Sequence, residues 1–306
     1  MIMKFHSGFF KDISSMLNAN DYNVVIKVGE HQDTKEFHAH SNILRVYSQH
    51  FKYAISSDII KNDRITINKP NIIPAVFEII LEYIYTGKLN LKKQSSANKF
   101  NLLMACDDLI LEELGEYVQK YLIKKRAYWI QQNLVFILNC IFNNPNIRKL
   151  QNYCINSIRD NPLQIFTSSD FPSLDKYILF HLLKQDDLRV RIKEVIIWNS
   201  LIKWGIKRTP ELENKNTNQG KWTDIDYENL KNTLSIFIPL IKFNNLTSED
   251  FHDKVQPYKA IIPSDIYDDI MTYHLAKQST KQPSKEVNLF IMQSQFLKDK
   301  KKCQIS

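Results

Sequence analysis

Length, composition and charge already exclude several classes of protein. The chain has 306 residues, of which 43% are apolar and 24% charged, so it can form packed cores and is not a disordered protein. Its apolar runs, such as residues 195–198, are far shorter than the roughly 18 to 20 residues that cross a bilayer, so we expect no membrane span. The opening residues lack the continuous apolar core of a signal peptide. We therefore expect a cytoplasmic protein, with the nucleus as an additional location.

The net charge of +8 is concentrated near the C-terminal end of the sequence. Residues 277–306 hold seven lysines and two acidic residues, which places +5 in this tail and leaves +3 for the remainder. A body that is so weakly basic gives no reason to expect a nucleic-acid surface. Within the tail, residues 287–297 can form a short amphipathic helix, which is either a plain extension or a partner-binding segment.

An amphipathic helix is predicted within residues 1–20. Its apolar stripe consists of Phe9, Phe10, Ile13, Met16 and Leu17. Such a stripe covers either the core of its own subunit or a partner, and its composition alone leaves both open.

Residues 21–87 predict a small unit of strands and helices. Residues 22–28 alternate between apolar and polar side chains, which is the period of a strand with one buried face. We expect the following elements in order: a hairpin connection at 29–35, an extended run at 36–40, helices at 42–46 and 49–56, a strand at 64–67 and a helix between Asn71 and Gly87. Asn71 is predicted to cap this last helix, and Pro74 fits its first turn. Val46 and Ile73 are expected on inner helix faces.

Helices are predicted for the rest of the chain. Residues 95–109 and 111–124 form two amphipathic helices, with Tyr117 among the side chains expected to face inward. From Tyr128 on, further helices are expected at 134–142, 147–159, 175–183, 191–207, 227–241 and 264–274. Trp198 and Trp204 lie on one of these helices and are interpreted as core anchors.

The sequence offers no set of residues that predicts catalysis. Its six glycines are too far apart to build a phosphate-binding loop, and no nucleophile or metalloprotease motif is present. Of the four cysteines, Cys106, Cys140 and Cys154 are predicted to be buried thiols in helices. His38 and His40, with His31 and His50 nearby, could bind a metal, but a structural role is the stronger interpretation. We therefore expect no enzyme, no cofactor and no metal site.

Spaced motifs in residues 12–122 resemble the BTB/POZ domain. They are Asp21-Tyr22-x-Val24-Val25, Phe37-His38-Ala39-His40-x-x-Ile43-Leu44, Tyr47-Ser48-x-x-Phe51 and Tyr83-Ile84-Tyr85-Thr86-Gly87. Residues 179–204, with Leu182-Leu183-Lys184-Gln185-Asp186-Asp187-Leu188, Glu194 and Ile202-Lys203-Trp204, are similar to the BACK domain that follows BTB in Kelch-like proteins. No repeat of Kelch blades is visible.

This resemblance implies a fold class and a division into domains. The fold is an α+β BTB/POZ domain, with a small mixed sheet capped by helices, followed by an all-α BACK domain. We expect a dimerisation helix at 1–20, a BTB/POZ domain at 21–126, a BACK-like domain at 127–276 with a surface loop at 209–224, and a basic tail at 277–306. In this family the His that matches His40 is implied to bond local backbone.

The resemblance also implies a homodimeric protein-protein interaction adaptor. The dimer interface would consist of Phe9, Phe10, Ile13, Met16, Leu17 and Asp21. In some BTB dimers an Arg approaches the Asp that matches Asp21, but Ser41 stands at the position of that Arg. The interface of this chain should therefore depend more on its apolar residues.

Many relatives of this kind recruit a substrate protein to a cullin-RING ubiquitin ligase. The resemblance therefore implies a cullin and a substrate protein as partners of this chain, and the substrate is not identified by the sequence. The residues that would face the cullin are Phe51, Tyr53, Ile55, Asp58, Ile59 and Lys61. Lys61 stands where a carboxylate is expected, which reverses the local charge. The alternative is a dimeric scaffold that holds partners without any link to ubiquitin.

Overall fold

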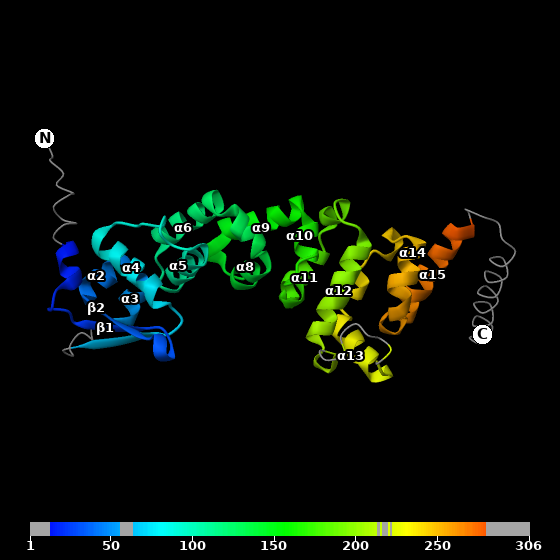
Figure 1. The fold of residues 1–306 in the computed structure, drawn as a ribbon, viewed down its shortest axis with the longest axis horizontal. Coiled ribbons are helices and arrows are strands. Elements are labelled where there is room, and N and C mark those ends of the chain that lie inside the picture. The colour runs from blue at the N-terminus through cyan, green and yellow to red at the C-terminus, as the bar shows by residue number, and fades with distance from the viewer. Residues whose placement is uncertain (1–12, 56–63, 213–214, 216–219, 221, 280–306) are drawn as a thin grey trace. The chain divides into compact units, whose positions relative to one another are not determined.

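The computed structural model describes residues 13–55, 64–212, 215, 220 and 222–279. The chain divides into two compact units (Figure 1). The first comprises residues up to 133 together with 143–154, and the second comprises 134–142 together with residues from 155 onward. Each unit is described by itself below.

A three-stranded sheet forms the centre of the first unit. The strands β1 (Val24–Val28), β2 (Lys35–Ala39) and β3 (Ile65–Lys69) lie in the order β2-β1-β3. Strand β1 is antiparallel to β2, with Ile26 opposite Phe37, and parallel to β3, with Ile26 opposite Ile67. The alternation predicted for β1 is confirmed, because its first, third and fifth residues are buried. The sheet is therefore mixed, as the resemblance implied.

Helices complete the first unit. They are α2 (Ser41–Tyr47), α3 (Gln49–Ala54), α4 (Pro74–Thr86), α5 (Ser96–Asp108), α6 (Glu112–Lys125) and α7 (Ala127–Gln132), and a 3-10 turn, Met16–Asn18, precedes the sheet. Helix α4 packs on the sheet, where the rings of Phe37 and Phe77 meet edge to face with centroids 5.0 Å apart. Gly87 ends this helix in the left-handed conformation, with φ of 65°.

Two details of α4 differ from the prediction. The residue before its first turn is Ile73 and not Asn71, and no side chain caps the helix. Pro74 at the first helical position has no N–H group that would need a cap, which reduces the demand for one. Ile73 lies before the helical stripe begins, and its side chain is 44% exposed, contrary to the prediction.

The second unit is helical in its described residues. Its elements include α8 (Leu134–Ile141), α10 (Pro162–Phe166), α11 (Lys176–Leu183), α12 (Glu194–Arg208), α13 (Asp224–Leu234), α14 (Ser248–Asp250) and α15 (Ser264–Ser279). Helix α9 (Arg148–Asp160) begins in the first unit and ends in the second. Helix α12 contacts α10 and α13, so it lies at the centre of the unit. No helix in the described part of the chain combines the length and apolarity that crossing a membrane requires.

Helix α12 anchors the core through its two tryptophans. Trp198 and Trp204 are buried, and each indole N–H donates to a backbone carbonyl oxygen at 2.8 Å, of Lys254 and Leu174 respectively. The prediction that these residues are core anchors is confirmed. Each bond satisfies the one polar group of a large apolar side chain.

Helix α13 is displaced from its predicted position. It begins at Asp224, because Thr223 and Asp226 form a reciprocal capping box, and it ends at Leu234. Pro239 then lies in a separate 3-10 turn, Ile238–Leu240. The predicted helix at 227–241 was wrong because it continued across a proline, which cannot donate the required N–H bond.

Candidate interaction surfaces

A polar network joins the start of the sheet to α4 in the first unit. The backbone N–H of His40 donates to the Tyr85 hydroxyl oxygen at 2.9 Å. His40 Nδ1 lies 2.8 Å from the same hydroxyl, and His40 Nε2 lies 3.2 Å from Asp21 Oδ1. Since the Tyr85 oxygen already accepts one bond, a neutral imidazole is satisfied when Tyr85 donates to Nδ1 and Nε2–H donates to Asp21. The network therefore fixes three segments far apart in the sequence.

The environment of this network changes two pKa values. The hydrogen bond from His40 lowers the pKa of Asp21, and burial raises the pKa of Tyr85 to about 12. His40 is buried, as its structural role requires. Its imidazole bonds two distant side chains, however, and the expectation of a bond to local backbone was wrong. The sequence motif predicts that this histidine has a structural role, but it does not predict the distant residues that bond it in the fold.

Ser41 occupies the position where the resemblance implied an arginine. Its backbone N–H donates to Asn23 Oδ1 at 2.9 Å, and the Asn23 amide donates to Ser41 Oγ at 2.9 Å. The residue is buried and uncharged, so no cation from this position reaches Asp21. The partner of Asp21 is His40, whose Nε2 lies 3.2 Å from Asp21 Oδ1.

The expected dimer residues are only partly described. Ile13, Met16 and Leu17 are half-buried on the turn before the sheet, and Asp21 is exposed. Phe9 and Phe10 lie outside the described residues. The predicted interface therefore stays a prediction, with three apolar side chains that retain accessible surface.

Two of the expected cullin-facing residues belong to the core. Phe51 and Ile55 are fully buried, which removes them from any docking surface. The reason is that α3 packs inward at Phe51, and Ile55 follows the helix into the same core. Tyr53 is 76% exposed and stays available to a partner. Asp58, Ile59 and Lys61 lie outside the described residues.

Four of the exposed large apolar side chains on the first unit lie on its α2–α3 and α5–α6 helix pairs. They are Val46, Tyr53, Ile110 and Tyr117, which lie on α2, on α3, in the turn between α5 and α6, and on α6. The predictions that Val46 and Tyr117 face inward were wrong, because the helices turn their other apolar positions toward the core. Ser48 Oγ donates to the Leu109 carbonyl at 2.6 Å and ties the start of α3 to the end of α5.

Ile110 has a backbone conformation that is unusual for its residue type. Its φ is 52°, in the left-handed region that β-branched residues rarely adopt. The turn nevertheless holds because the Ile110 and Leu111 amides donate to the carbonyls of Asp107 and Cys106. No sequence signal marked this position, since a glycine or asparagine is the usual residue there.

Charged groups accompany these side chains. Lys69 Nζ lies 2.9 Å from Asp108 Oδ2, just before the Ile110 turn. Burial, with a smaller contribution from Lys69, lowers the pKa of His50 on α3. Burial and Glu113 raise the pKa of Tyr83. The arrangement provides apolar and hydrogen-bonding contacts but no nucleophile paired with a base.

The histidines considered for a metal site are separated by their surroundings. The His38 ring stacks on Tyr22 with centroids 3.8 Å apart, and His40 bonds Tyr85 and Asp21. Within the described ranges, no group of three or more His, Cys, Asp or Glu side chains is arranged to hold a metal ion. Of the cysteines predicted to be buried, Cys106 and Cys154 are buried but Cys140 is exposed, because it lies on the outer face of α8.

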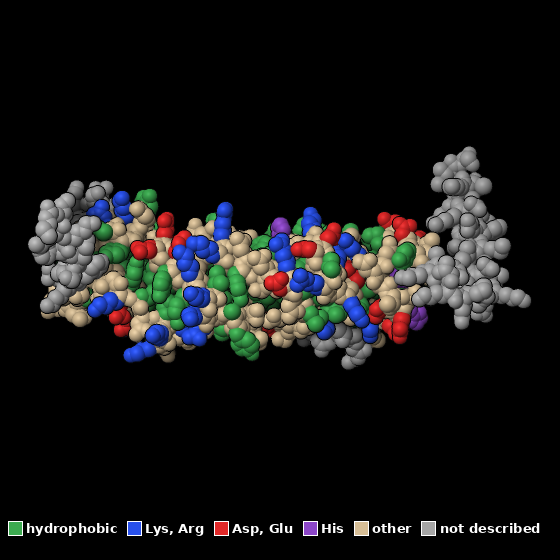
Figure 2. Space-filling view, turned by 90° about the horizontal axis from the view of Figure 1, so that it is seen from above, with side chains coloured by type: hydrophobic (Ala, Val, Ile, Leu, Met, Phe, Trp, Pro, Cys, Tyr) green, Lys and Arg blue, Asp and Glu red, His purple; other side chains and the backbone are tan. Residues whose placement is uncertain are grey.

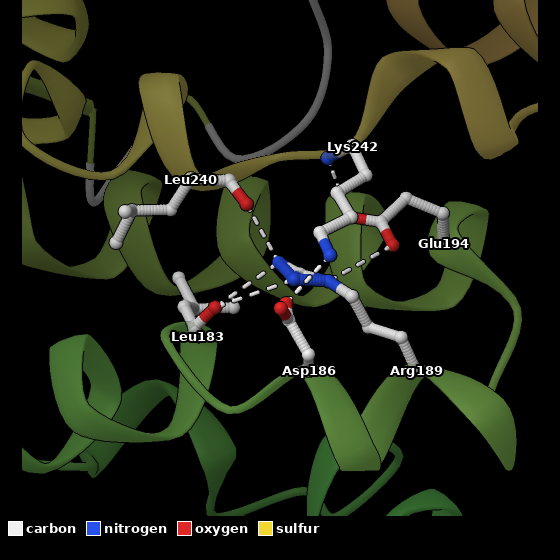
Figure 3. A network of polar contacts seen from close by, with 6 residues as sticks. All are labelled: Leu183, Asp186, Arg189, Glu194, Leu240 and Lys242. Atoms are coloured by element: carbon white, nitrogen blue, oxygen red, sulfur yellow. Dashed lines mark hydrogen bonds and ion pairs between the residues drawn. The ribbon is translucent and has the colours of Figure 1, made fainter.

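A buried ion pair organises the second unit (Figure 3). Arg189 Nε lies 3.3 Å from Glu194 Oε2, and both side chains are almost fully buried. The Arg189 guanidinium also donates to the carbonyl oxygens of Leu183 and Leu240, while Glu194 Oε1 accepts the Lys242 backbone N–H at 2.9 Å. The pair therefore connects the end of α11, the start of α12 and the segment after α13. Neither residue was predicted to interact with the other.

The fold defines a class of protein: a small mixed sheet with a helical cap, followed by a helical unit. Comparison with known families agrees with that class. The family model described as "BTB/POZ domain" matches residues 13–126, and the model described as "BTB And C-terminal Kelch" matches residues 143–218.

The relatives found by comparison are similar to large parts of the chain. Kelch-like protein 40a of Danio rerio is 24% identical over 81% of this chain and 36% of its own length. Kelch-like protein 41 of Mus musculus is 24% identical over 72% of this chain and 32% of its own length. The solved BTB domain of zebrafish PATZ1 shares 19% identity over 41% of this chain and 98% of its own, with a TM-score of 0.33.

The chain is a BTB-BACK protein whose homologues are Kelch-like proteins. It spans about a third of the length of the Kelch-like proteins named above. The predicted fold class, a BTB/POZ domain followed by a helical BACK domain, is confirmed. Its homologues belong to an adaptor family that is typically non-enzymatic.

Proposed function

We propose that the chain is a homodimeric adaptor that brings a substrate protein to a cullin-RING ubiquitin ligase. The observation that carries this proposal is the exposure of Val46, Tyr53, Ile110 and Tyr117 on the α2–α3 and α5–α6 pairs of the first unit. The first unit is called the BTB unit from here on, and the second is called the BACK unit. The BTB-BACK homologues support an adaptor role in general. The identity of the substrate stays open.

These side chains would stabilise a complex through the apolar area that they bury. Burying a large apolar side chain against a partner contributes about 1.5–3 kcal/mol, so a few such residues can supply the centre of an interface. Figure 2 shows that hydrophobic side chains reach the surface beside cationic ones on the face that it displays.

Self-association would use the turn before the sheet. Ile13, Met16 and Leu17 retain accessible surface there, and they continue the stripe that begins at Phe9 and Phe10 in the sequence. Because His40 and not an arginine bonds Asp21, this dimer would have less ionic and more apolar character than one that uses the arginine. Light scattering coupled to gel filtration measures its mass against the 36.1 kDa of one chain.

The link to a cullin is tested by binding to a cullin N-terminal region. Tyr53→Asp and Ile59→Asp should each weaken binding at least about tenfold, because a carboxylate would enter an apolar contact. Val190→Asp is the matched control, since Val190 is also strongly exposed, at 85%, but belongs to the second unit. Equal loss in all three variants would contradict the proposed surface.

A scaffold without any ubiquitin link is the second candidate, and Lys61 favours it. A lysine at a position that carries an acid in cullin-binding relatives would repel a cation on the cullin. The scaffold predicts a stable dimer with no cullin binding at micromolar concentration. Lys61→Glu would then create or strengthen cullin binding only if the rest of the surface is compatible.

A further inference from the structure

Strand β2 is an edge of the sheet, and its outward backbone groups can be identified. Asn23 and Gly29 direct their backbone bonds toward β3, since the Asn23 carbonyl accepts the Ile65 N–H and the Gly29 N–H donates to Lys69. By alternation, Val24, Ile26 and Val28 face β2 and pair with Ala39, Phe37 and Lys35. The N–H and C=O groups of Glu36 and His38 therefore point away from the sheet.

The two ends of this edge differ in how their polar groups are satisfied. The next outward N–H, that of His40, donates to the Tyr85 hydroxyl and is therefore not available to an added strand. Within the described part of the chain, no contact off the sheet satisfies the backbone groups of Glu36 or His38. This leaves a two-residue stretch with the donors and acceptors that an added strand needs.

A groove runs beside this open edge. Its volume is about 540 Å³ and its wall consists of three segments: residues 17–20, strand β2 up to His38, and the outer face of α4. Leu81 provides apolar surface in the wall, together with Leu17, which the proposed dimer interface shares. An extended chain that lies in this groove would bond β2 through its backbone and contact α4 through its side chains.

The charged groups that line the groove are mainly acidic. They are Glu36, Glu78 and Glu82 against a single lysine, Lys35. Lys35 pairs with Glu78 at 3.3 Å, and Glu36 pairs with Lys27 at 3.2 Å, whereas Glu82 forms no ion pair with any described residue. A segment that enters the groove would therefore meet an uncompensated carboxylate and be favoured by positive charge.

We propose that the β2 edge binds an extended basic segment of a partner protein as a fourth strand. The backbone of that segment pairs with Glu36 and His38, and a Lys or Arg side chain contacts Glu82. This surface is separate from the α2–α3 and α5–α6 surfaces of the proposed cullin contact. It would give the BTB unit a second kind of partner.

The test uses the full chain and a fluorescent peptide, acetyl-Lys-Thr-Lys-Val-Lys-Thr-Lys-amide, with fluorescence anisotropy as the readout. The peptide should bind saturably, and a matched peptide with Glu in place of every Lys should not. Two N-methylated versions, each blocking one alternate set of amides, separate strand pairing from charge attraction. Only one set faces β2, so one version should bind about tenfold or more weakly while the other stays near the parent.

Protein variants complete the test. Glu82→Lys should weaken binding about tenfold, while Glu112→Lys, a reversal of an exposed charge on α6, should leave it nearly unchanged. Equal affinity for the two N-methylated peptides, or equal effects of the two charge reversals, would overturn the proposal. Peptide binding that dissociates the dimer in light scattering would also overturn it, since a second copy would then be the natural occupant.

Discussion

The BTB unit and the BACK unit both bury polar side chains, but they compensate them differently. In the BTB unit, His40 and Tyr85 are joined by hydrogen bonds, and the carboxylate that completes the network, Asp21, lies at the surface. In the BACK unit, a full cation and a full anion, Arg189 and Glu194, are both buried (Figure 3). The first arrangement leaves its charge in water, whereas the second takes both charges out of it.

Because of this difference, the stability of the two units should respond differently to the loss of one polar side chain. A neutral bond that is lost costs about the desolvation of one polar group. A buried ion that loses its partner costs much more, because the remaining charge has no water to solvate it. The BACK unit should therefore be more sensitive to single polar substitutions than the BTB unit, although both have apolar cores.

Arg189→Met should have the largest effect. It leaves the Glu194 carboxylate with only the Lys242 N–H and leaves the Leu183 and Leu240 carbonyls without their donor, so we expect a loss of about 3–5 kcal/mol in the free energy of unfolding. Urea denaturation measures it. Arg191→Met is the control, since that arginine is exposed, lies 3.7 Å from the Asp160 carboxylate and donates to the Asp160 carbonyl at 3.1 Å, and it should cost less than about 1 kcal/mol. Equal losses in the free energy of unfolding for the two variants would contradict the proposed importance of the buried ion pair.

Glycine substitutions compare the packing of the two units. A Cβ at Gly205 on α12 would lie 2.8 Å from Leu234 Cδ2 and 2.9 Å from Leu230 Cδ1, so Gly205→Ala should destabilise the BACK unit by about 1–3 kcal/mol. At Gly115 on α6 the nearest atom is Cys106 Cβ at 3.5 Å, an ordinary contact. Gly115→Ala should therefore be neutral or stabilise by up to about 1 kcal/mol through helix propensity. Thermal unfolding of both variants checks the opposite signs.

Tyr85→Phe should have a moderate effect on the BTB unit. It removes the hydroxyl that accepts the His40 N–H and bonds Nδ1, so a loss of about 1–3 kcal/mol is expected in urea denaturation. Tyr53→Phe is the control, because Tyr53 is exposed. A loss as large as that of Arg189→Met would show that the BTB network is as demanding as the buried ion pair.

Asp21→Asn should have the smallest effect, visible mainly as a pH dependence. The pKa of Asp21 is below its ordinary value of 3.8 in the folded chain, so its ionised form contributes stability above that value and the contribution is lost as the pH falls through the folded pKa. The difference between the parent and Asp21→Asn should therefore be present at about pH 6 and vanish at about pH 2. A difference that grows on acidification would have the wrong sign for this account.

The sequence predicted local elements better than contacts across the fold. Strand β1 followed from its alternation, and the end of α4 followed from Gly87, because both signals are carried by neighbouring residues. The partners of His40 could not be predicted, since Tyr85 is 45 positions away. Helix α13 begins earlier than predicted because Thr223 and Asp226 form a capping box, and this Thr-x-x-Asp spacing is visible in the sequence.

The candidate surfaces show the same limit. Phe51 and Ile55 were assigned to a partner by resemblance, but their apolar character serves the core. Tyr117 was assigned to the core by helical spacing, but it is 54% exposed. Periodicity locates a stripe to within about one residue in a turn, and the choice of the buried edge of that stripe depends on which neighbours pack against it.

Analytical ultracentrifugation of the chain mixed with a cullin N-terminal region tests the central claim most directly. The account predicts that the chain alone sediments as a dimer of 36.1 kDa subunits and that the mixture gives a complex with two chains and two cullin regions. Tyr53→Asp should leave the dimer intact and abolish the complex. A monomer at micromolar concentration that also ignores the cullin region would contradict the account.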